Sequence, residues 1–374
     1  MTKENLWILS EERPKAEVIA CILDKFAKDK NITCFIDTIR ILPILSDDGT
    51  FKFKYEVIGF YSPKIEKIFL KIVSGHSSFV DYLIFYQDRE PETSDIPLYA
   101  IEETKTDDSE SRNTGVFQRA TKFIFVDHYY KNIKKIMLYN LRISQKAEPT
   151  DTNIFGTRCL LTLGVEIIGK ELDTKTFKPF ATIDELIMFK NKMGKPPKGN
   201  VPITIDKQID QIQISGRLAK SGSLSHDPNI GALSLIAATL RKLGWTKKIV
   251  IINHGLGKMR LLPSNKFIKI ASMLDIEIEG CQVPKATMNT EYWKYETESE
   301  KIGTIFIHLT VENFSNGKAI FENHAGCEKG YFVTKKGTYS FKYDYYCYNE
   351  YFRSKCFYAR YSISTKMEHA NDRE

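Results

Sequence analysis

The chain has 374 residues, of which 42% are hydrophobic and 27% are charged, and its formal net charge is +7 at pH 7. These fractions are close to the averages of globular domains, so intrinsic disorder is not expected. No apolar run approaches the roughly 20 residues that span a bilayer, and the N-terminus has no hydrophobic signal-peptide core. We therefore expect a soluble, cytoplasmic protein without membrane contacts.

The first third of the chain predicts one helix followed by strands. Apolar residues between Lys15 and Asp29 recur at helical spacing. Runs rich in β-branched and aromatic residues follow at 33–36, 51–60 and 67–73.

Residues 79–105 predict a β-hairpin. Two runs of strand-forming residues, 80–86 and 96–101, flank a polar stretch that contains Pro91.

Beyond the hairpin the pattern alternates between helix and strand. A helix with one apolar face is expected from about Thr114, and strands are expected at Ile133–Tyr139 and Thr157–Ile168. This series predicts an α/β (α+β) fold with a central mixed sheet flanked by helices.

Residues 191–200, rich in lysine, proline and glycine, are the best linker candidate. A second α/β segment follows, with a helix that Asp227 caps and that ends near Gly244, a buried strand at Ile249–Ile252, and a helix over Phe267–Leu274. The remainder is expected to be β-rich.

The seven cysteines favour neither a disulfide framework nor a zinc site. Their number is odd and no two are spaced as C-x-x-C. We expect reduced thiols that are mostly buried.

A short acidic and basic motif ends the hairpin. In Glu103-Thr104-Lys105 the two outer side chains point to one face of a strand, which Ile101 shares, whereas Glu102 points to the other face. Carboxylates at this position, together with a lysine, suit phosphodiester hydrolysis. Mg²⁺ takes oxygen ligands and neutralises charge at phosphorus, and a lysine can orient the attacking water.

Three upstream acids could join Glu103, namely Asp81, Asp88 and Asp95. If the hairpin turns near residue 91 or 92, antiparallel partners have numbers that sum to about 183 or 184. Asp81 then lies opposite residue 102 or 103. Asp88 lies far along the strand and Asp95 lies in the turn. Cross-strand neighbours are roughly 5 Å apart, a distance that one cation can bridge, so the geometry favours Asp81.

This arrangement resembles the PD-(D/E)xK nuclease superfamily, and type II restriction endonucleases in particular. The resemblance is carried by residues 80–86 and 96–105, and it covers roughly Lys15 to Ile143. It implies a restriction-endonuclease-like mixed sheet, metal ligation by Asp81 and Glu103, and Lys105 at the attacking water. Mg²⁺ is the implied cofactor, and Mn²⁺ is expected to substitute. Val80 stands where the family name has proline, so one defining residue of the family motif is absent.

The helix after the motif supplies two further candidates. Relatives of this fold often carry a polar residue there, and Gln118 is the matching position, while Arg119 could reach a DNA phosphate. Arg112 in the preceding loop is a third candidate DNA contact, and Glu56 could be a further acid from an earlier strand.

Basic residues cluster in the second half of the chain. Eight occur between Arg241 and Lys269 with no Asp or Glu among them, which favours a polyanionic partner. The DNA contacts expected from this segment are Lys247, Lys248, Lys258, Arg260 and Lys266. Basic residues also alternate with aromatic ones between Lys335 and Lys366, a pattern that fits either a nucleic-acid surface or an amphipathic sheet with half-buried tyrosines.

Other chemistries find less support. The chain has neither a P-loop nor a G-x-G-x-x-G motif, so no nucleotide cofactor is expected. His226 and His254 are interpreted as a helix-cap residue and a loop residue, because their spacing does not suit one histidine–metal unit.

The sequence thus predicts a sequence-specific double-stranded DNA endonuclease, acting as a homodimer if its site is palindromic. The expected parts are a catalytic domain at 1–190, the linker at 191–200, and a DNA-recognition and dimerisation region at 201–374. Two alternatives stay open: a repair or mobile-element nuclease of the same superfamily, and a DNA-binding protein without enzymatic activity.

Overall fold

A computed structural model gives the architecture. It describes residues 3–10, 14–44, 50–51, 54–75, 80–92, 94–104, 115–139, 149–169, 171–193, 203–216, 228–253, 270–279, 295–296, 303–305, 318–324, 327–334, 337–343 and 357–359.

The backbone forms two compact units. The first comprises Met1–His76, Asp81–Tyr99 and Lys294–Glu374, and the second comprises Ser77–Val80 and Ala100–Trp293.

The largest sheet has eight strands in the order β10-β9-β8-β7-β1-β5-β4-β2. Its strands are β1 (Glu4–Ser10), β2 (Phe35–Pro43), β4 (Lys54–Tyr61), β5 (Ile65–Ile72), β7 (Tyr82–Tyr86), β8 (Tyr99–Thr104), β9 (Lys134–Tyr139) and β10 (Val165–Ile168). The sheet is mixed, because β1 runs parallel to β5 and antiparallel to β7. The predicted α/β class with a large mixed sheet flanked by helices is therefore confirmed.

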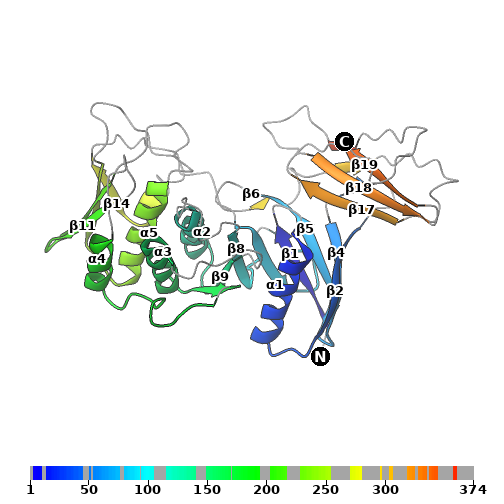
Figure 1. Ribbon diagram of the computed structural model, residues 1–374, viewed down its shortest axis with the longest axis horizontal. Coiled ribbons are helices and arrows are strands. Elements are labelled where there is room, and N and C mark those ends of the chain that lie inside the picture. The colour runs from blue at the N-terminus through cyan, green and yellow to red at the C-terminus, as the bar shows by residue number, and fades with distance from the viewer. Residues whose placement is uncertain are drawn as a thin grey trace. The chain divides into compact units, whose positions relative to one another are not determined.

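In the first unit, helix α1 (Ala16–Asp29) covers one face of the sheet (Figure 1). Its fully buried Phe26 approaches two strand tyrosines, with ring centroids 5.4 Å from Tyr86 and 6.4 Å from Tyr99. The helix predicted over Lys15–Asp29 is confirmed. The sequence signal for it is that apolar positions recur on one side of the helix.

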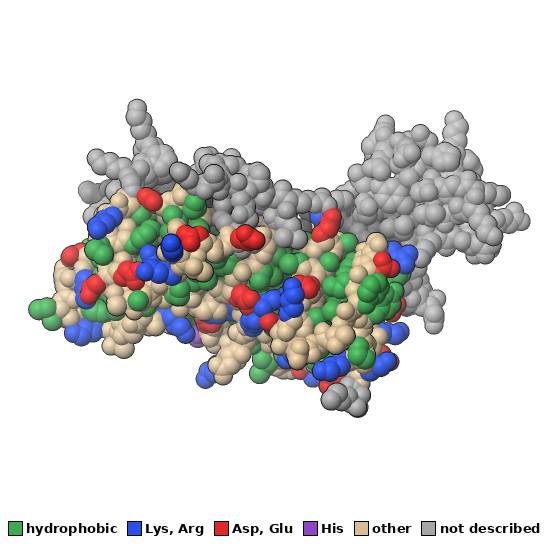
Figure 2. All heavy atoms as spheres, turned by 60° about the horizontal axis from the view of Figure 1, so that its bottom comes forward, with side chains coloured by type: hydrophobic (Ala, Val, Ile, Leu, Met, Phe, Trp, Pro, Cys, Tyr) green, Lys and Arg blue, Asp and Glu red, His purple; other side chains and the backbone are tan. Residues whose placement is uncertain are grey.

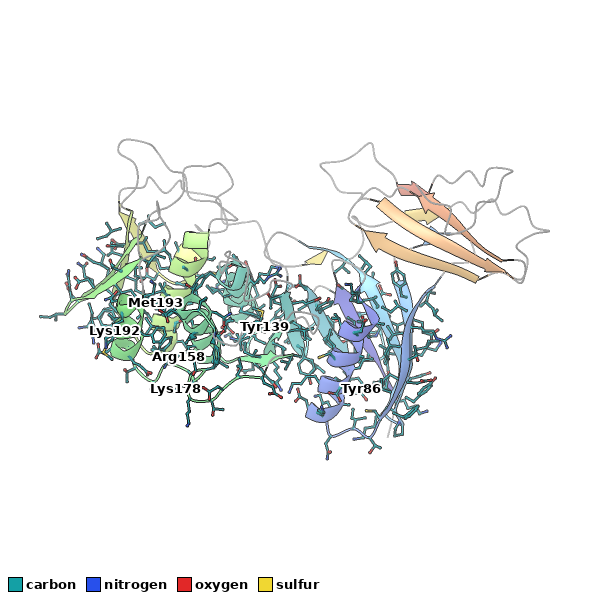
Figure 3. The ribbon with its side chains drawn as sticks, viewed as in Figure 1. Tyr86, Tyr139, Arg158, Lys178, Lys192 and Met193 are labelled. Atoms are coloured by element: carbon teal, nitrogen blue, oxygen red, sulfur yellow. The ribbon has the colours of Figure 1, made fainter. Side chains whose placement is uncertain are left out.

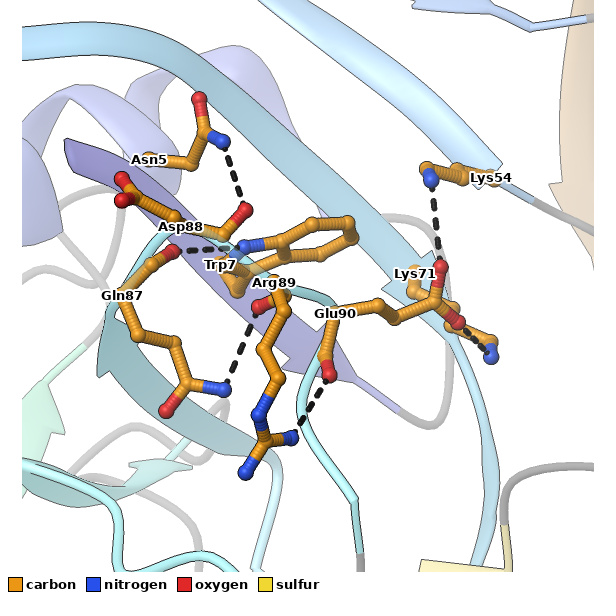
Figure 4. A network of polar contacts seen from close by, with 8 residues as sticks. All are labelled: Asn5, Trp7, Lys54, Lys71, Gln87, Asp88, Arg89 and Glu90. Atoms are coloured by element: carbon orange, nitrogen blue, oxygen red, sulfur yellow. Dashed lines mark hydrogen bonds and ion pairs between the residues drawn. The ribbon is translucent and has the colours of Figure 1, made fainter.

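The loop after β7 is fastened to the sheet by the polar contacts in Figure 4. The indole Nε1 of Trp7 donates to the carbonyl of Gln87 at 3.1 Å. The Glu90 carboxylate accepts from Lys54 at 3.1 Å and also from Lys71. Lys54 in turn lies 4.6 Å above the Trp7 ring. An aromatic ring and two lysines from separate strands thus hold an acidic loop in place.

A bulge in the edge strand β2 requires a glycine beside it. The β2–β4 register shifts between Ile36 and Arg40. Gly59 on β4 has φ +97, and a Cβ at this position would lie 2.3 Å from the Thr38 carbonyl oxygen. Only glycine fits both this backbone conformation and this close approach.

In the second unit a helical layer lies between two sets of strands (Figure 1). Its helices are α2 (Gly115–Tyr129), α3 (Asp151–Thr162) and α5 (Pro228–Lys242), which pack against one another. On one side lies the β8–β9–β10 edge of the large sheet. On the other lies a four-stranded sheet in the order β11-β12-β13-β14. Those strands are β11 (Thr204–Lys207), β12 (Gln211–Gly216), β13 (Lys248–Asn253) and β14 (Ile276–Glu279).

The strand expected at Thr157–Ile168 is wrong over most of its length. Residues up to Thr162 belong to α3, whose N-cap Thr150 accepts from the Asn153 amide, and only Val165–Ile168 form strand β10. Every residue from Phe155 to Leu160 is buried. Because these six successive residues are all buried, the segment has no exposed polar face whose spacing would distinguish a helix from a buried strand.

Arg158 joins α3 to the following loop and to helix α4 (Ile183–Lys192). Its Nε donates to the carbonyl of Lys178 at 2.8 Å, and Figure 3 labels both residues. Its guanidinium lies 4.1 Å above the ring of Phe180. It also pairs with Glu185, whose carboxylate accepts from the Ala181 amide at 2.9 Å. The N-cap Thr182 accepts from the Glu185 amide at 3.1 Å.

The two sides of the linker candidate are hydrogen-bonded together. Asn191 donates to the Ile205 carbonyl at 2.8 Å and accepts from the Ile205 amide at 3.0 Å, and Lys190 donates to the Ile203 carbonyl at 3.1 Å. Residues 194–200 themselves lie outside the described part of the chain. Helix α4 and strand β11 both belong to the second unit, and the predicted domain boundary stays a prediction.

The remaining described strands form a two-stranded sheet, β15-β6, and two three-stranded sheets, β20-β16-β3 and β17-β18-β19. Strands β17 (Lys318–His324), β18 (Cys327–Thr334) and β19 (Gly337–Tyr343) are antiparallel. The others are β3 (Thr50–Phe51), β6 (Ser74–Gly75), β15 (Tyr295–Glu296), β16 (Gly303–Ile305) and β20 (Phe357–Ala359).

Cys21, Cys34 and Cys159, the cysteines whose side chains are described, are free thiols. No helix within the described ranges has the length and apolar character needed to cross a membrane.

Candidate functional site

Strand β8 ends in two buried acids. The strand is buried throughout, and relative exposure is 0% for Glu102 and 3% for Glu103. Burying a carboxylate is expensive unless cations or hydrogen-bond donors compensate it. The partners of these acids therefore decide what each of them can do.

Glu102 is compensated by two cations from helix α2. Arg119 Nη1 lies 3.1 Å from Glu102 Oε1, and Lys122 Nζ lies 2.9 Å from Glu102 Oε2. Residues three apart in a helix share one face, so both cations reach the same carboxylate. This contact assigns Glu102 to the α2 side of the strand, and strand alternation directs Glu103 to the opposite side.

Arg119 also holds the backbone at Glu103. Its Nη1 donates to the Glu103 carbonyl oxygen at 2.6 Å, and 26% of its side chain is exposed. The sequence prediction gave Arg119 to a DNA phosphate. That role stays a prediction, and the structure adds an anchoring contact within the protein that sequence reasoning missed. The sequence signal that could have revealed this contact is the pair of basic residues, Arg119 and Lys122, three apart on the helix that follows Glu102 and Glu103.

A further ion pair between α2 and a strand involves Lys135 of β9. Its Nζ lies 2.6 Å from both carboxylate oxygens of Asp127 and 2.6 Å from the Leu163 carbonyl oxygen. Burial lowers the pKa of Lys135, and the Asp127 carboxylate opposes this shift. Lys135 thus joins the ends of α2 and α3 to β9.

The three candidate partners of Glu103 have different surroundings. Asp81 directly precedes β7 in the first unit and is partly exposed. Asp88 is exposed. Asp95 accepts from Arg89 at 2.5 and 2.7 Å and from the Glu92 amide at 2.8 Å, so its carboxylate organises the loop. The choice of Asp81 stays a prediction.

Several predicted site residues lie outside the described part of the chain. Gln118 belongs to α2, but its side chain is not described. The others outside it are Lys105, Arg112, Lys258, Arg260 and Lys266.

Three described residues of the basic segment, Arg241, Lys247 and Lys248, have partners within the protein. Lys248 pairs with Glu277 at 2.7 Å, and Lys247 donates to the Ile209 carbonyl at 2.7 Å. The Arg241 guanidinium donates to four backbone carbonyls at 2.6–2.8 Å, those of Trp245, Lys247, Leu274 and Asp275. In Figure 2, basic and acidic side chains intermingle on the described face in view. The DNA contacts assigned to Lys247 and Lys248 stay predictions.

The donor atoms of the proposed metal ligands suit Mg²⁺. Asp81 and Glu103 offer only carboxylate oxygens, and Mg²⁺ is commonly held by one or two carboxylates, with water and substrate phosphate completing its shell. Among the described side chains, no three His, Cys, Asp or Glu residues gather into a group that could hold a metal ion.

Comparisons with protein-family models, with curated proteins and with solved structures find no match to this chain.

Proposed function

We propose that the chain is a magnesium-dependent endonuclease of double-stranded DNA, of the type II restriction class. Asp81 and Glu103 would hold the metal and Lys105 would act at the attacking water. The observation that carries the proposal is the division between the two acids of β8. Glu102 is paired with two cations on one side of the strand, while Glu103 projects from the other side at the strand end.

This division leaves Glu103 suited to chemistry. The two buried carboxylates point in opposite directions from the strand, so a metal on the Glu103 side would not compete with the α2 cations that hold Glu102. A divalent cation on the Glu103 side would favour the ionised carboxylate there. Asp81 enters the proposal as the second oxygen donor because the hairpin pairing expected from the sequence places it opposite residue 102 or 103.

When bound, Mg²⁺ would neutralise charge on the phosphate and favour ionisation of a water. The protein's own groups have narrower tasks. Asp81 and Glu103 would supply carboxylate oxygen ligands. Lys105, which shares the Glu103 face by alternation, would orient the attacking water and stabilise negative charge at phosphorus.

DNA binding in this proposal uses the basic residues beyond β13, with Lys258, Arg260 and Lys266 as the main phosphate contacts. Phosphate contacts position the duplex and provide most of the salt-dependent affinity. A palindromic target would need two copies of the chain related by a twofold axis.

The test is to incubate the purified full chain with several plasmids and a bacteriophage-sized genomic DNA, with Mg²⁺ or with EDTA. Discrete fragments that appear only with Mg²⁺, with ends that map to one short sequence, are expected. A Mg²⁺-dependent smear would favour a repair or mobile-element nuclease. Salt-sensitive binding with intact DNA in both Mg²⁺ and Mn²⁺ would favour the non-enzymatic alternative and contradict the proposal.

A further inference from the structure

We infer that Arg119 is a positioning residue that fixes Glu103 for metal binding. This inference rests on the proposed function, because it gives Arg119 a role through the metal ligand. The contact at issue joins helix α2 to the end of strand β8, with both elements in the same compact unit.

One nitrogen of Arg119 makes both contacts. Nη1 lies 3.1 Å from Glu102 Oε1 and 2.6 Å from the Glu103 carbonyl oxygen. A guanidinium Nη carries two N–H groups in a fixed plane, so it can donate to a carboxylate and a carbonyl at once. The side chain thereby ties the charge of one acid to the backbone of the next.

Glu102 holds the guanidinium in place. Its carboxylate is fully buried, and Lys122 occupies its second oxygen at 2.9 Å. Buried charge-assisted hydrogen bonds are short, directional and costly to break. The Arg119 guanidinium therefore cannot move away without leaving a buried carboxylate partly uncompensated, and the Glu103 carbonyl stays fixed to α2.

Fixing this carbonyl matters for the Glu103 side chain. Metal ligands need positions held to within about 0.5 Å, and they depend on surrounding groups for that precision. Loss of a group that orients a metal ligand typically reduces metal affinity or activity about 10–100-fold. Arg119 meets this description because it donates to the backbone carbonyl of Glu103.

Lys135 provides a matched control. It is also a buried cation that joins α2 to a strand, through Asp127 at 2.6 Å, and it also donates to a backbone carbonyl, that of Leu163. Its strand is β9, and its carbonyl partner is not a candidate ligand. Lys135→Met should therefore destabilise the same helix–strand layer without disturbing Glu103.

The experiment compares full-length wild type, Arg119→Ala, Arg119→Lys and Lys135→Met. Mn²⁺ binding is measured by the electron paramagnetic resonance signal of free Mn²⁺. Thermal unfolding and amide hydrogen exchange over residues 100–104 are measured on the same samples. Mn²⁺ stands in for Mg²⁺ because both prefer oxygen ligands.

Arg119→Ala should weaken Mn²⁺ binding about 10–100-fold and speed amide exchange at the end of β8. Arg119→Lys keeps the charge beside Glu102 but lacks the planar fork. It should unfold near the wild-type temperature and still bind Mn²⁺ about 10-fold more weakly. Lys135→Met should unfold at a lower temperature and bind Mn²⁺ like wild type. This separation of stability from metal affinity is the signature of a positioning role.

Wild-type Mn²⁺ affinity in Arg119→Lys, with unchanged exchange over residues 100–104, would overturn the inference and leave the proposed function intact. This outcome remains decisive if Arg119→Ala does not fold. Equal weakening by Lys135→Met and Arg119→Lys would also overturn it, because general loosening would then explain the loss. A wild-type chain that neither binds Mn²⁺ nor cuts DNA would overturn both the inference and the proposed function. This outcome is distinguishable from the two above because it is already seen in the wild-type protein, before any variant is measured.

Discussion

The Nζ of Lys248 on β13 lies 2.7 Å from the carboxylate of Glu277 on the neighbouring strand β14. Glu277 follows the acid-free basic segment in the sequence, yet it meets that segment in space because β13 and β14 pair in parallel. Counting charges along the chain therefore overstates how many of these cations lack a counter-charge. The proposed phosphate contacts are therefore placed on the basic residues beyond β13, Lys258, Arg260 and Lys266.

Replacing Lys258 and Arg260 together with alanine should weaken binding to any duplex. Each lost phosphate contact should reduce the slope of log affinity against log salt concentration by about 0.9. Fluorescence anisotropy titrations at four or five salt concentrations measure this slope. If one of the two residues reads a guanine, discrimination at one base pair should fall as well.

Arg241→Met is the matched control for that pair. The Arg241 guanidinium donates to four backbone carbonyls, so its loss should destabilise the unit, at about 1 kcal/mol for each hydrogen bond. The salt slope should stay at the wild-type value. An unchanged slope in the Lys258 and Arg260 variant would instead move the DNA surface elsewhere, with the aromatic and basic stretch after Lys335 as the next candidate.

Glu103→Gln and Glu102→Gln should have opposite consequences. Glu103→Gln removes a proposed metal ligand, so the cleavage rate should fall by more than about 100-fold. Loss of a group that only orients a metal ligand typically reduces activity by about 10–100-fold. DNA binding and the unfolding temperature should change little. Asp81→Ala and Lys105→Ala should likewise abolish cleavage and retain binding.

Glu102→Gln leaves Arg119 and Lys122 facing a neutral amide in a buried position. Loss of one partner from a buried ion pair typically costs about 3–5 kcal/mol, so chemical unfolding should show a marked loss of stability. Normal cleavage by the Glu103→Gln protein, measured on the mapped target, would refute the assignment of Glu103.

Cleavage should require Mg²⁺ or Mn²⁺, and Ca²⁺ should support binding without turnover. The reason is that Asp81 and Glu103 offer only oxygen donors, which suit hard cations. Fragment yield is measured in each metal after the chain has been treated with EDTA. A chelator that removes zinc but spares Mg²⁺ should have no effect, whereas full activity in excess EDTA would contradict the proposed site.

Glu90 should contribute stability that depends on pH. Burial raises the pKa of its carboxyl, but hydrogen bonds and charge from Lys71 and Lys54 outweigh burial and hold the pKa below its ordinary value of 4.5. A folded pKa below the unfolded one means that the unfolded chain binds more protons. The stabilisation is therefore fully present above about pH 5 and is lost as pH falls through 4.5 toward the lowered pKa.

Glu90→Gln should accordingly unfold at a lower temperature than wild type at pH 7, and the difference should shrink as pH falls below 4.5. Thermal unfolding at pH 7, 5, 4 and 3.5 measures it. Glu92→Gln is the control in the same loop, because its carboxylate is 71% exposed and exposed ion pairs contribute little. A difference between wild type and Glu90→Gln that does not change with pH would show that Lys54 and Lys71 do not stabilise the ionised carboxylate.

Much of the fold could be predicted because it is encoded locally. The helix α1 and the strands β5 and β9 lie where apolar periodicity predicts them, within a few residues at each end. In the sequence, helix α3 resembles a strand, because residues 155–160 are all buried and no exposed polar face reveals the helical spacing. Its capping residue Thr150 was the sequence signal that could have corrected this.

For the candidate site, the sequence by itself determined that Glu102 and Glu103 point to opposite faces of one strand, because side-chain alternation is a property of the extended backbone. It could not determine which side chains lie beside each acid. Only the tertiary structure decided that Arg119 and Lys122 compensate Glu102 and that Arg119 also holds the Glu103 carbonyl. The same holds for Lys248 and Glu277. The physical reason is that ion pairing depends on distances of a few ångströms between elements far apart in the chain, and those distances are set by how helices and strands pack.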